Sequence, residues 1–290
     1  MPRLAGRMTS CQDGVDKLGW NVGATYACHG VRVGFRAKNA AALAQLVSWL
    51  PRAMTLATPG DVPVLYSYLE GGAAPGSKVK RFHILYRNFL RVARSLDLDD
   101  LRSAFGRDLN MYIGEHASRR IFVHAGVVAI DGAAVLIPGK SFSGKTTLTR
   151  ALVDRGGVYF SDEYAVLDSR GNVSPWAEPL SIRKNGARES GEKHSAESLG
   201  MQTGRGSLPV RLVVMTSFKE GQRFKPRTVT PGAGALGLLE HTLPARRRPE
   251  AALKSLASAV TGARILHGPR GDAAKAADAI VRYLATPRSV

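Results

Sequence analysis

The pattern of apolar and polar positions divides the chain into two parts with different signals. In the first part, residues 31–36 alternate apolar and polar side chains as a half-buried strand does, and residues 41–50 have helical spacing. Residues 65–69 predict a second strand, followed by a glycine-rich turn at residues 71–76. A longer helix is predicted behind an acidic start from apolar side chains four residues apart: Leu101, Phe105, Leu109 and Ile113. Residues 1–118 therefore predict a small α+β module, and its part in substrate docking or in a homo-oligomer stays open.

The second part, residues 119–290, has longer apolar runs. Residues 121–130 are largely apolar, and Asp131-Gly132 then predicts a tight hairpin turn into a further apolar run at residues 133–137. The pattern also predicts later strands and two terminal helices, at residues 158–160, 161–168, 175–182, 211–215, 250–260 and 272–284. Each terminal helix has one predicted apolar face: Leu253, Leu256 and Val260 on the first, Ala276, Ile280 and Leu284 on the second.

Composition and charge narrow the class of protein. A chain of 290 residues with 44% hydrophobic residues suits a globular protein, and no apolar run approaches the about 20 residues that span a bilayer. The start of the chain lacks the apolar core of a signal peptide, and two cysteines are too few for a disulfide framework. We therefore expect a cytoplasmic protein without membrane contact. The net charge of +18 suits an acidic or phosphate-bearing partner, but the basic residues are scattered, which does not favour nucleic-acid binding.

The strongest chemical signal follows the apolar run at residues 133–137. Eight residues fill the pattern G-x-x-x-x-G-K-[ST] of a phosphate-binding loop: Gly139, Lys140, Ser141, Phe142, Ser143, Gly144, Lys145 and Thr146. The glycines let backbone N–H groups face phosphate oxygens, and the predicted helix behind them, with Thr147 in its first turn, adds its positive end. Lys145 is expected to reach the β- and γ-phosphates of ATP, and the Thr146 hydroxyl to bind Mg²⁺. Strand, loop and helix predict a nucleotide-binding α/β domain.

Two acidic residues follow the next short apolar run. Asp162 lies 17 residues after Lys145, where a carboxylate can meet Mg²⁺, its water or an attacking hydroxyl. Glu163 stands beside it, and side chains alternate along a strand. The two carboxylates are therefore expected to point in different directions and to have different roles. An acidic surface turn is the alternative interpretation of this pair.

Three further features carry weaker signals. His124 precedes the hairpin turn, although a single histidine is more often a packed or surface residue than a catalytic one. Arg183 ends an apolar segment and is a candidate clamp for a phosphate. Residues 184–207 form a polar stretch without periodicity, and a loop of this length is usually functional or disordered. This loop is a candidate to close over the substrate and exclude water.

Taken together, His124-Ala125-Gly126, the loop of residues 139–146 and Ser161-Asp162-Glu163 resemble the catalytic domain of HPr kinase/phosphorylase. They are most similar to the HPr-kinase-related bacterial proteins found beside ribosomal-peptide biosynthesis genes, including lasso-peptide kinases. The resemblance covers residues 118–185 well and the rest of the second part loosely. It implies a fold of the phosphoenolpyruvate-carboxykinase type, a P-loop set in a mixed sheet, with ATP and Mg²⁺ as cofactors.

The resemblance also implies roles for single residues. Thr146 and Asp162 would bind the metal, Asp162 would be the base for a substrate serine, and His124 would lie near the transferred phosphate. Two departures from the family matter. Glu163 stands where the family has a second aspartate, and Thr147 stands where the bifunctional enzyme has an acidic residue. Both departures argue against the reverse, phosphorolytic reaction.

The sequence thus predicts an ATP-dependent kinase that transfers the γ-phosphate to a hydroxyl, with Ser of a peptide or small protein as the favoured acceptor. The predicted catalytic residues are Asp162, Lys145, His124, Glu163 and Arg183. Three alternatives remain at this stage: a regulatory ATP-binding NTPase without a phosphoacceptor, a small-molecule kinase, and a basic binding module.

Overall fold

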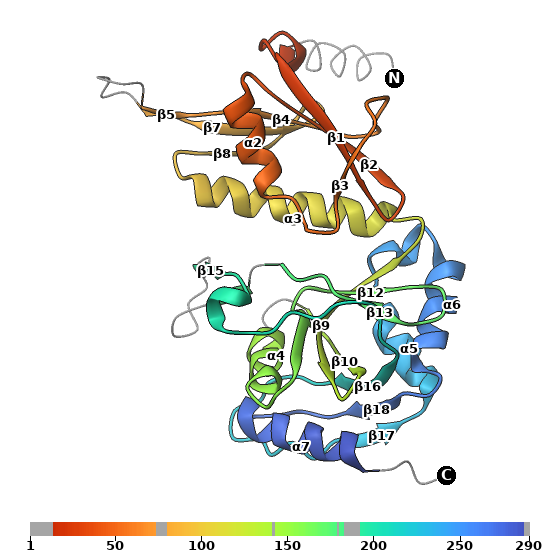
Figure 1. Ribbon diagram of the computed structural model, residues 1–290. Helices are drawn as coiled ribbons and strands as arrows, with labels where there is room; N and C mark the ends of the chain where they lie inside the picture. Colours follow the sequence, from red (N-terminus) through yellow and green to blue (C-terminus); the bar gives the residue numbers. More distant parts are fainter. Residues whose placement is uncertain (1–13, 74–79, 141–142, 179, 183–191, 287–290) are drawn as a thin grey trace, which may run out of the picture. The chain divides into compact units, whose positions relative to one another are not determined.

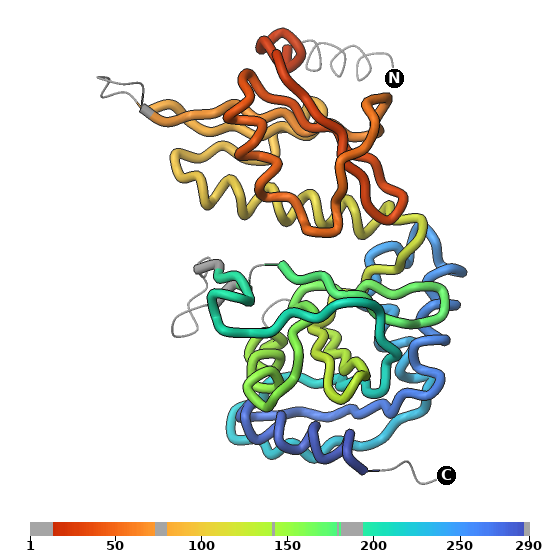
Figure 2. The backbone as a smooth tube through the Cα atoms, viewed as in Figure 1, coloured from red at the N-terminus to blue at the C-terminus, as the bar shows by residue number. Residues whose placement is uncertain are grey.

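The computed structural model describes residues 14–73, 80–140, 143–178, 180–182 and 192–286. Its internal contacts divide the chain into two compact units, Met1–Ser118 and Arg119–Val290. Each unit is built around its own mixed β-sheet, and Figure 2 traces the backbone through both units. In the part of the chain that the structure describes, no helix is both long and apolar enough to cross a membrane.

The first unit is a mixed sheet with two helices packed against it (Figure 1). In sheet order the strands are β3 (Thr55–Ala57), β1 (Val22–Cys28), β2 (Val31–Ala37), β4 (Leu65–Leu69), β7 (His83–Arg87) and β8 (Leu90–Ser95). The helices are α2 (Ala40–Ser48) and α3 (Leu98–His116). All four apolar side chains predicted to face the core from α3 are fully buried. The predicted glycine-rich turn begins as a short strand pair, β5 (Gly72–Ala73) with β6 (Lys80–Arg81).

The second unit contains the larger sheet. In order its strands are β13 (Val173–Ser174), β12 (Tyr164–Leu167), β9 (Ile121–Ile130), β10 (Ala133–Pro138), β16 (Val210–Met215), β18 (Arg264–His267) and β17 (Arg227–Val229), and β11 (Val158–Ser161) also pairs with β9. The predicted hairpin joins β9 to β10 through Asp131 and Gly132, whose φ values of 49° and 72° suit a tight turn between twisted strands. β10, β16 and β18 run parallel, so the loops at their carboxyl ends share one edge of the sheet.

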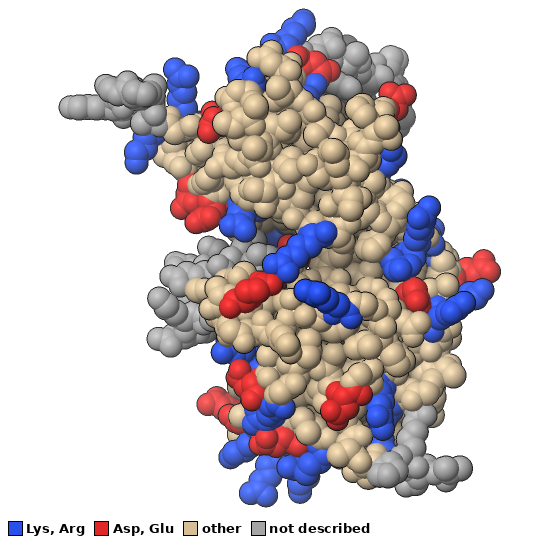
Figure 3. Space-filling model, in the orientation of Figure 1, with Lys and Arg blue, Asp and Glu red and all other residues tan. Residues whose placement is uncertain are grey.

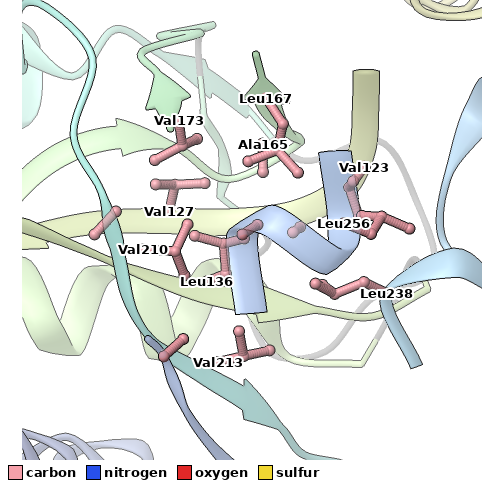
Figure 4. Close-up of a cluster of buried hydrophobic side chains, with 14 of the residues drawn as sticks. Val123, Val127, Leu136, Ala165, Leu167, Val173, Val210, Val213, Leu238 and Leu256 are labelled. Carbon is pink, nitrogen blue, oxygen red and sulfur yellow. The ribbon is translucent and has the colours of Figure 1, made fainter. Parts of the chain in front are cut away.

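Helices cover both faces of this sheet. α4 (Lys145–Val153) and α7 (Ala273–Ala285) bury apolar residues on one face, and α5 (Pro231–Leu239) and α6 (Pro249–Val260) on the other. Side chains alternate along β10, so that Val135 packs on the face covered by α4 and α7, the first cluster, and Leu136 on the face covered by α5 and α6, the second cluster. Figure 4 shows the second cluster, where Leu136 lies among Leu238 and Leu256 of the covering helices. The predicted α/β architecture, with a P-loop in a mixed sheet, is confirmed.

Two expectations for the second unit were wrong in detail. Of the strand predicted at residues 175–182, the described residues form a strand only at Leu180–Ile182, β14, and Pro175 cannot donate a backbone hydrogen bond. Leu253 is 43% exposed, although we placed it on the buried face of α6. The buried face of α6 contains Leu256, Ala259 and Val260, which lie four, seven and eight residues after the buried Ala252. Leu253 is one residue after Ala252 and therefore lies at the border of this face.

The polar stretch at residues 184–207 is only partly a loop. Its described part contains β15 (Glu192–His194), which pairs with β14, and the 3₁₀ helix Glu197–Leu199. Residues 183–191 lie outside the described residues, so the predicted closing motion stays a prediction. The surface view in Figure 3 shows Lys and Arg side chains dispersed over both units, with Asp and Glu among them.

Candidate active site

The phosphate-loop signature lies between β10 and α4, in the predicted order of strand, loop and helix. The N-cap of α4 is Gly144, whose φ of +83° lies in the left-handed region that favours glycine. A Cβ at this position would also lie 2.4 Å from Nη2 of Arg270. The backbone conformation therefore favours glycine here, and any larger residue would also displace the guanidinium of Arg270. Three predicted site residues lie outside the described part of the chain: Ser141, Phe142 and Arg183.

Lys145 opens α4 and is nearly buried, with 7% of its surface exposed. Its Nζ donates to the carbonyl oxygens of Gly139 (2.7 Å) and Lys140 (2.9 Å), so the ammonium group lies inside the loop. Burial lowers the pKa of Lys145, and the negative charges of Glu163 and Asp162 partly offset that effect. The positive end of α4 and this ammonium group together form a site suited to phosphate oxygens.

Asp162 follows β11 and is the most enclosed carboxylate of the site, with 4% exposure. Its Oδ2 accepts a hydrogen bond from the Thr146 hydroxyl (3.0 Å), and its Oδ1 accepts one from the Tyr159 hydroxyl (2.9 Å). Burial raises the pKa of Asp162 to about 6, helped by the charge of Glu163, while the two hydroxyl donors and Lys145 act in the opposite direction. The loop hydroxyl and the carboxylate are thus in direct contact.

Glu163 has different contacts from this pair, as predicted, although it lies with Asp162 in the bend between β11 and β12 and not on a strand. Its side chain is 49% exposed, and its Oε2 lies 3.1 Å from Nε2 of His124. The contact follows from strand pairing, because β12 lies antiparallel to β9 with Tyr164 opposite His124. The structure therefore brings His124 and Glu163 together on one side of the site. Asp162 and Thr146 lie together on the other side, and Thr147 of α4 is exposed.

Three residues at the site escaped the sequence analysis. The Tyr159 hydroxyl holds Asp162, and the buried guanidinium of Arg270 donates from Nη2 to the Gly144 carbonyl (2.7 Å). The carbonyl of His241 accepts from the backbone N–H of His124 (2.8 Å). The pKa of His241 is lowered by burial first and by the nearby positive groups, among them His124. Arg270 and His241 come from distant segments, so no sequence signal near the phosphate loop marks them. Tyr159 lies only three residues before Asp162 and was predicted as part of a strand without a role at the site.

The donor set fits Mg²⁺ and a nucleotide phosphate. A hydroxyl and a carboxylate 3.0 Å apart are hard oxygen ligands, which Mg²⁺ uses in ones and twos together with substrate phosphates. Within the described ranges, no group of three or more His, Cys, Asp or Glu side chains is placed to hold a metal ion. Thr146 and Asp162 would hold the ion, and Lys145 with the α4 N-terminus would hold the phosphates.

Comparisons with known proteins point to one family. No family model matches the chain. The HPr kinase/phosphorylases of Streptococcus pneumoniae strains Hungary19A-6 and ATCC 700669 / Spain 23F-1 are each 29% identical to it over 116 residues. These alignments cover 38% of this chain and 37% of each relative, so the chain spans well under half the length of the curated relatives.

A solved structure, the HPr(Ser) kinase/phosphatase from Coxiella burnetii, matches 56% of this chain and 94% of its own, with 19% identity and a TM-score of 0.34. The similarity that carries weight is the sequence alignment with the curated relatives, and in this chain the hydroxyl of the phosphate loop contacts the first residue of an Asp-Glu pair. Over the aligned 116 residues, this chain is similar to HPr kinase/phosphorylases.

Proposed function

We propose that this protein is an ATP-dependent kinase that transfers the γ-phosphate of ATP to a hydroxyl group. One observation carries the proposal: the Thr146 hydroxyl, at the start of α4, donates to the buried carboxylate of Asp162 (3.0 Å). The contact joins a phosphate-binding loop to a carboxylate that can bind a metal ion or accept the proton of an acceptor hydroxyl. The curated relatives, which are kinases by name, support the same reaction class.

The residues of the site divide the work of phosphoryl transfer. Lys145 and the N–H groups at the start of α4 bind and orient the phosphates, while Thr146 and Asp162 hold Mg²⁺. Bound Mg²⁺ supplies positive charge that offsets the charge of the phosphates. Catalysis of this kind depends on positioning and electrostatics more than on covalent chemistry.

Two carboxylates compete for the role of base. Asp162 has a pKa of about 6, which suits a base near neutral pH, but both of its oxygens already accept hydroxyl hydrogen bonds. Glu163 is half exposed and contacts His124, so it is the more accessible of the two. We assign the base to Asp162 and the orientation of His124 to Glu163. Asp162→Asn and Glu163→Gln separate these assignments, since only the variant of the true base should abolish transfer. Asp162→Asn should also weaken Mg·ATP binding, because Asp162 is a proposed Mg²⁺ ligand.

The acceptor that we propose is Ser of a peptide or small protein. The curated relatives are kinases of HPr by name, which supports a protein acceptor. A role beside ribosomal-peptide biosynthesis, as in lasso-peptide kinases, is part of the same proposal. A regulatory NTPase and a small-molecule kinase are the competing functions. They differ from the proposed kinase in the product that carries the γ-phosphate of ATP: free phosphate for the NTPase and a low-mass product for the small-molecule kinase.

The test is a labelling reaction with Mg²⁺ and γ-labelled ATP in extract from the protein's own source. Label on a peptide or protein, seen with the wild type and absent with Asp162→Asn, is the expected result. Asp131→Asn is the matched control, because Asp131 is an exposed turn residue with a positive φ that Asn adopts readily. Label released only as free phosphate would favour the regulatory NTPase, and a labelled low-mass product would favour the small-molecule kinase.

A further inference from the structure

An exposed aromatic side chain lies beside the phosphate loop and has no part in the chemistry described above. Phe218 follows β16 in the chain and is 59% exposed. Burial of an aromatic ring is strongly favourable, so a ring left in water next to a candidate ligand site is a notable exception. Its position at the carboxyl ends of the parallel strands is the edge where α/β proteins bind ligands.

The backbone around Phe218 is fixed to the loop that follows β18. The Arg270 N–H donates to the Ser217 carbonyl (2.9 Å), and the Lys219 N–H donates to the Arg270 carbonyl (2.7 Å). These two bonds bracket Phe218 in a short parallel bridge with Arg270. The backbone that bears the exposed ring is therefore held in place by hydrogen bonds on both sides of Phe218.

Arg270 also connects this ring to the phosphate loop. Its guanidinium carbon lies 5.9 Å from the centroid of the Phe218 ring, and its Nη2 donates to the Gly144 carbonyl at 2.7 Å. With ordinary bond lengths, these contacts place the ring centroid within about 10 Å of that carbonyl oxygen. An α-phosphate and a ribose can span such a distance. A triphosphate held by the loop would thus have its base within reach of the ring.

We propose that the exposed face of Phe218 is the stacking platform for the nucleobase of the bound nucleoside triphosphate. This inference rests on the proposed function, since it places the base of the same nucleotide. Stacking on an aromatic ring tolerates every base, because each base has a π-face. The platform therefore binds adenine and guanine similarly and adds affinity without strong selection between ATP and GTP.

The test separates the base from the phosphates. Binding of Mg·ATP, Mg·GTP and inorganic tripolyphosphate with Mg²⁺ to the full chain is measured by calorimetry. Phe218→Ala should weaken ATP and GTP binding by about 5- to 150-fold, the range expected for one stacked base. Tripolyphosphate affinity should stay within about twofold, since it has no base to stack. Phe218→Trp should restore nucleotide binding, and its fluorescence should change with ATP and not with tripolyphosphate.

Leu236→Ala is the matched control, because Leu236 is a similarly exposed apolar side chain (62%) on α5. It should leave all three affinities unchanged. Unchanged ATP affinity in Phe218→Ala would overturn the platform while leaving the proposed function intact. The same holds if this variant raises only the KM of the phosphoacceptor, which would make Phe218 an acceptor contact. A wild-type protein that binds neither ATP nor tripolyphosphate would instead overturn the proposed function and the platform with it.

Discussion

Replacing Asp162 by Asn should stabilise the nucleotide-free protein at neutral pH, even though it removes a central group of the candidate site. The carboxylate is 4% exposed, and burial raises its pKa from the ordinary 3.8 to about 6. Its charged form is therefore disfavoured in the folded protein. The two hydroxyl donors, Tyr159 and Thr146, offset only part of the cost of burial.

The magnitude and the pH dependence follow from linkage. One pKa unit corresponds to about 1.4 kcal/mol, so the difference between 3.8 and about 6 corresponds to about 3 kcal/mol. Below about pH 4, the Asp162 carboxyl is protonated in both states, and its contribution to stability is fully present. As the pH rises from about 4 through about 6, the carboxyl ionises in the unfolded state while it stays protonated in the folded state, so that contribution to stability is lost. The amide introduced by Asp162→Asn would carry no charge at any pH, so the advantage of this variant should grow from near zero at pH 4 to at most about 3 kcal/mol at pH 8.

Urea unfolding with EDTA at several pH values is the assay, followed by hydrogen exchange of peptides from β9 and β10 so that the signal reports the second unit. For a unit of this size, 3 kcal/mol also corresponds to a rise in Tm of about 6–12 °C. Asp131→Asn, at an exposed turn, should show no such pH-dependent gain. A loss of stability in Asp162→Asn at pH 8, or a difference that is the same at all pH values, would refute the reasoning.

Two further predictions concern the packing of the loop and its helix. Arg270→Met removes the charged donor that holds the Gly144 carbonyl, so tripolyphosphate affinity should fall by about 10- to 150-fold in a binding titration, with partial rescue by Arg270→Lys; equal affinity in Arg270→Met and the wild type would contradict this role. Gly126→Ala would place a Cβ 2.5 Å from Thr149 Oγ1 beneath α4, and urea unfolding should show a loss of about 1–3 kcal/mol. Gly232→Ala, which meets nothing within 4 Å, is its control and should not destabilise.

The parts of the fold that the sequence predicted are those with local signals. The hairpin into the phosphate loop depends on Asp131-Gly132 between two apolar runs, and both residues adopt the positive φ that such a turn needs. The start of α4 depends on Gly144 and the residues on either side of it. The sequence also predicted different directions for Asp162 and Glu163, and their contacts agree, although both residues lie in the bend between β11 and β12 and not on a strand.

The parts that the sequence did not predict depend on contacts between distant segments. Arg270 lies 126 residues from the carbonyl that it holds, so no pattern near Gly144 could reveal it. α5 was missed because its sequence is rich in glycine, a poor helix former, although Thr230 caps its first turn. β18 was missed because four residues are too few to show a period, and pairing with β16 and β17 gives it strand geometry.

The electrostatics of the site also say what kind of ligand would complete it. Lys145 and Asp162 are both buried, and burial favours the neutral form of each group. It lowers the pKa of the Lys145 amine and raises the pKa of the Asp162 carboxyl. Each therefore lacks enough opposite charge in the nucleotide-free state. A phosphate alone would satisfy the ammonium and repel the carboxylate, and a cation alone would do the reverse. Only a ligand that carries both, such as Mg²⁺ with a nucleoside triphosphate, satisfies the two groups at once, which is the charge pattern that a phosphoryl-transfer site requires.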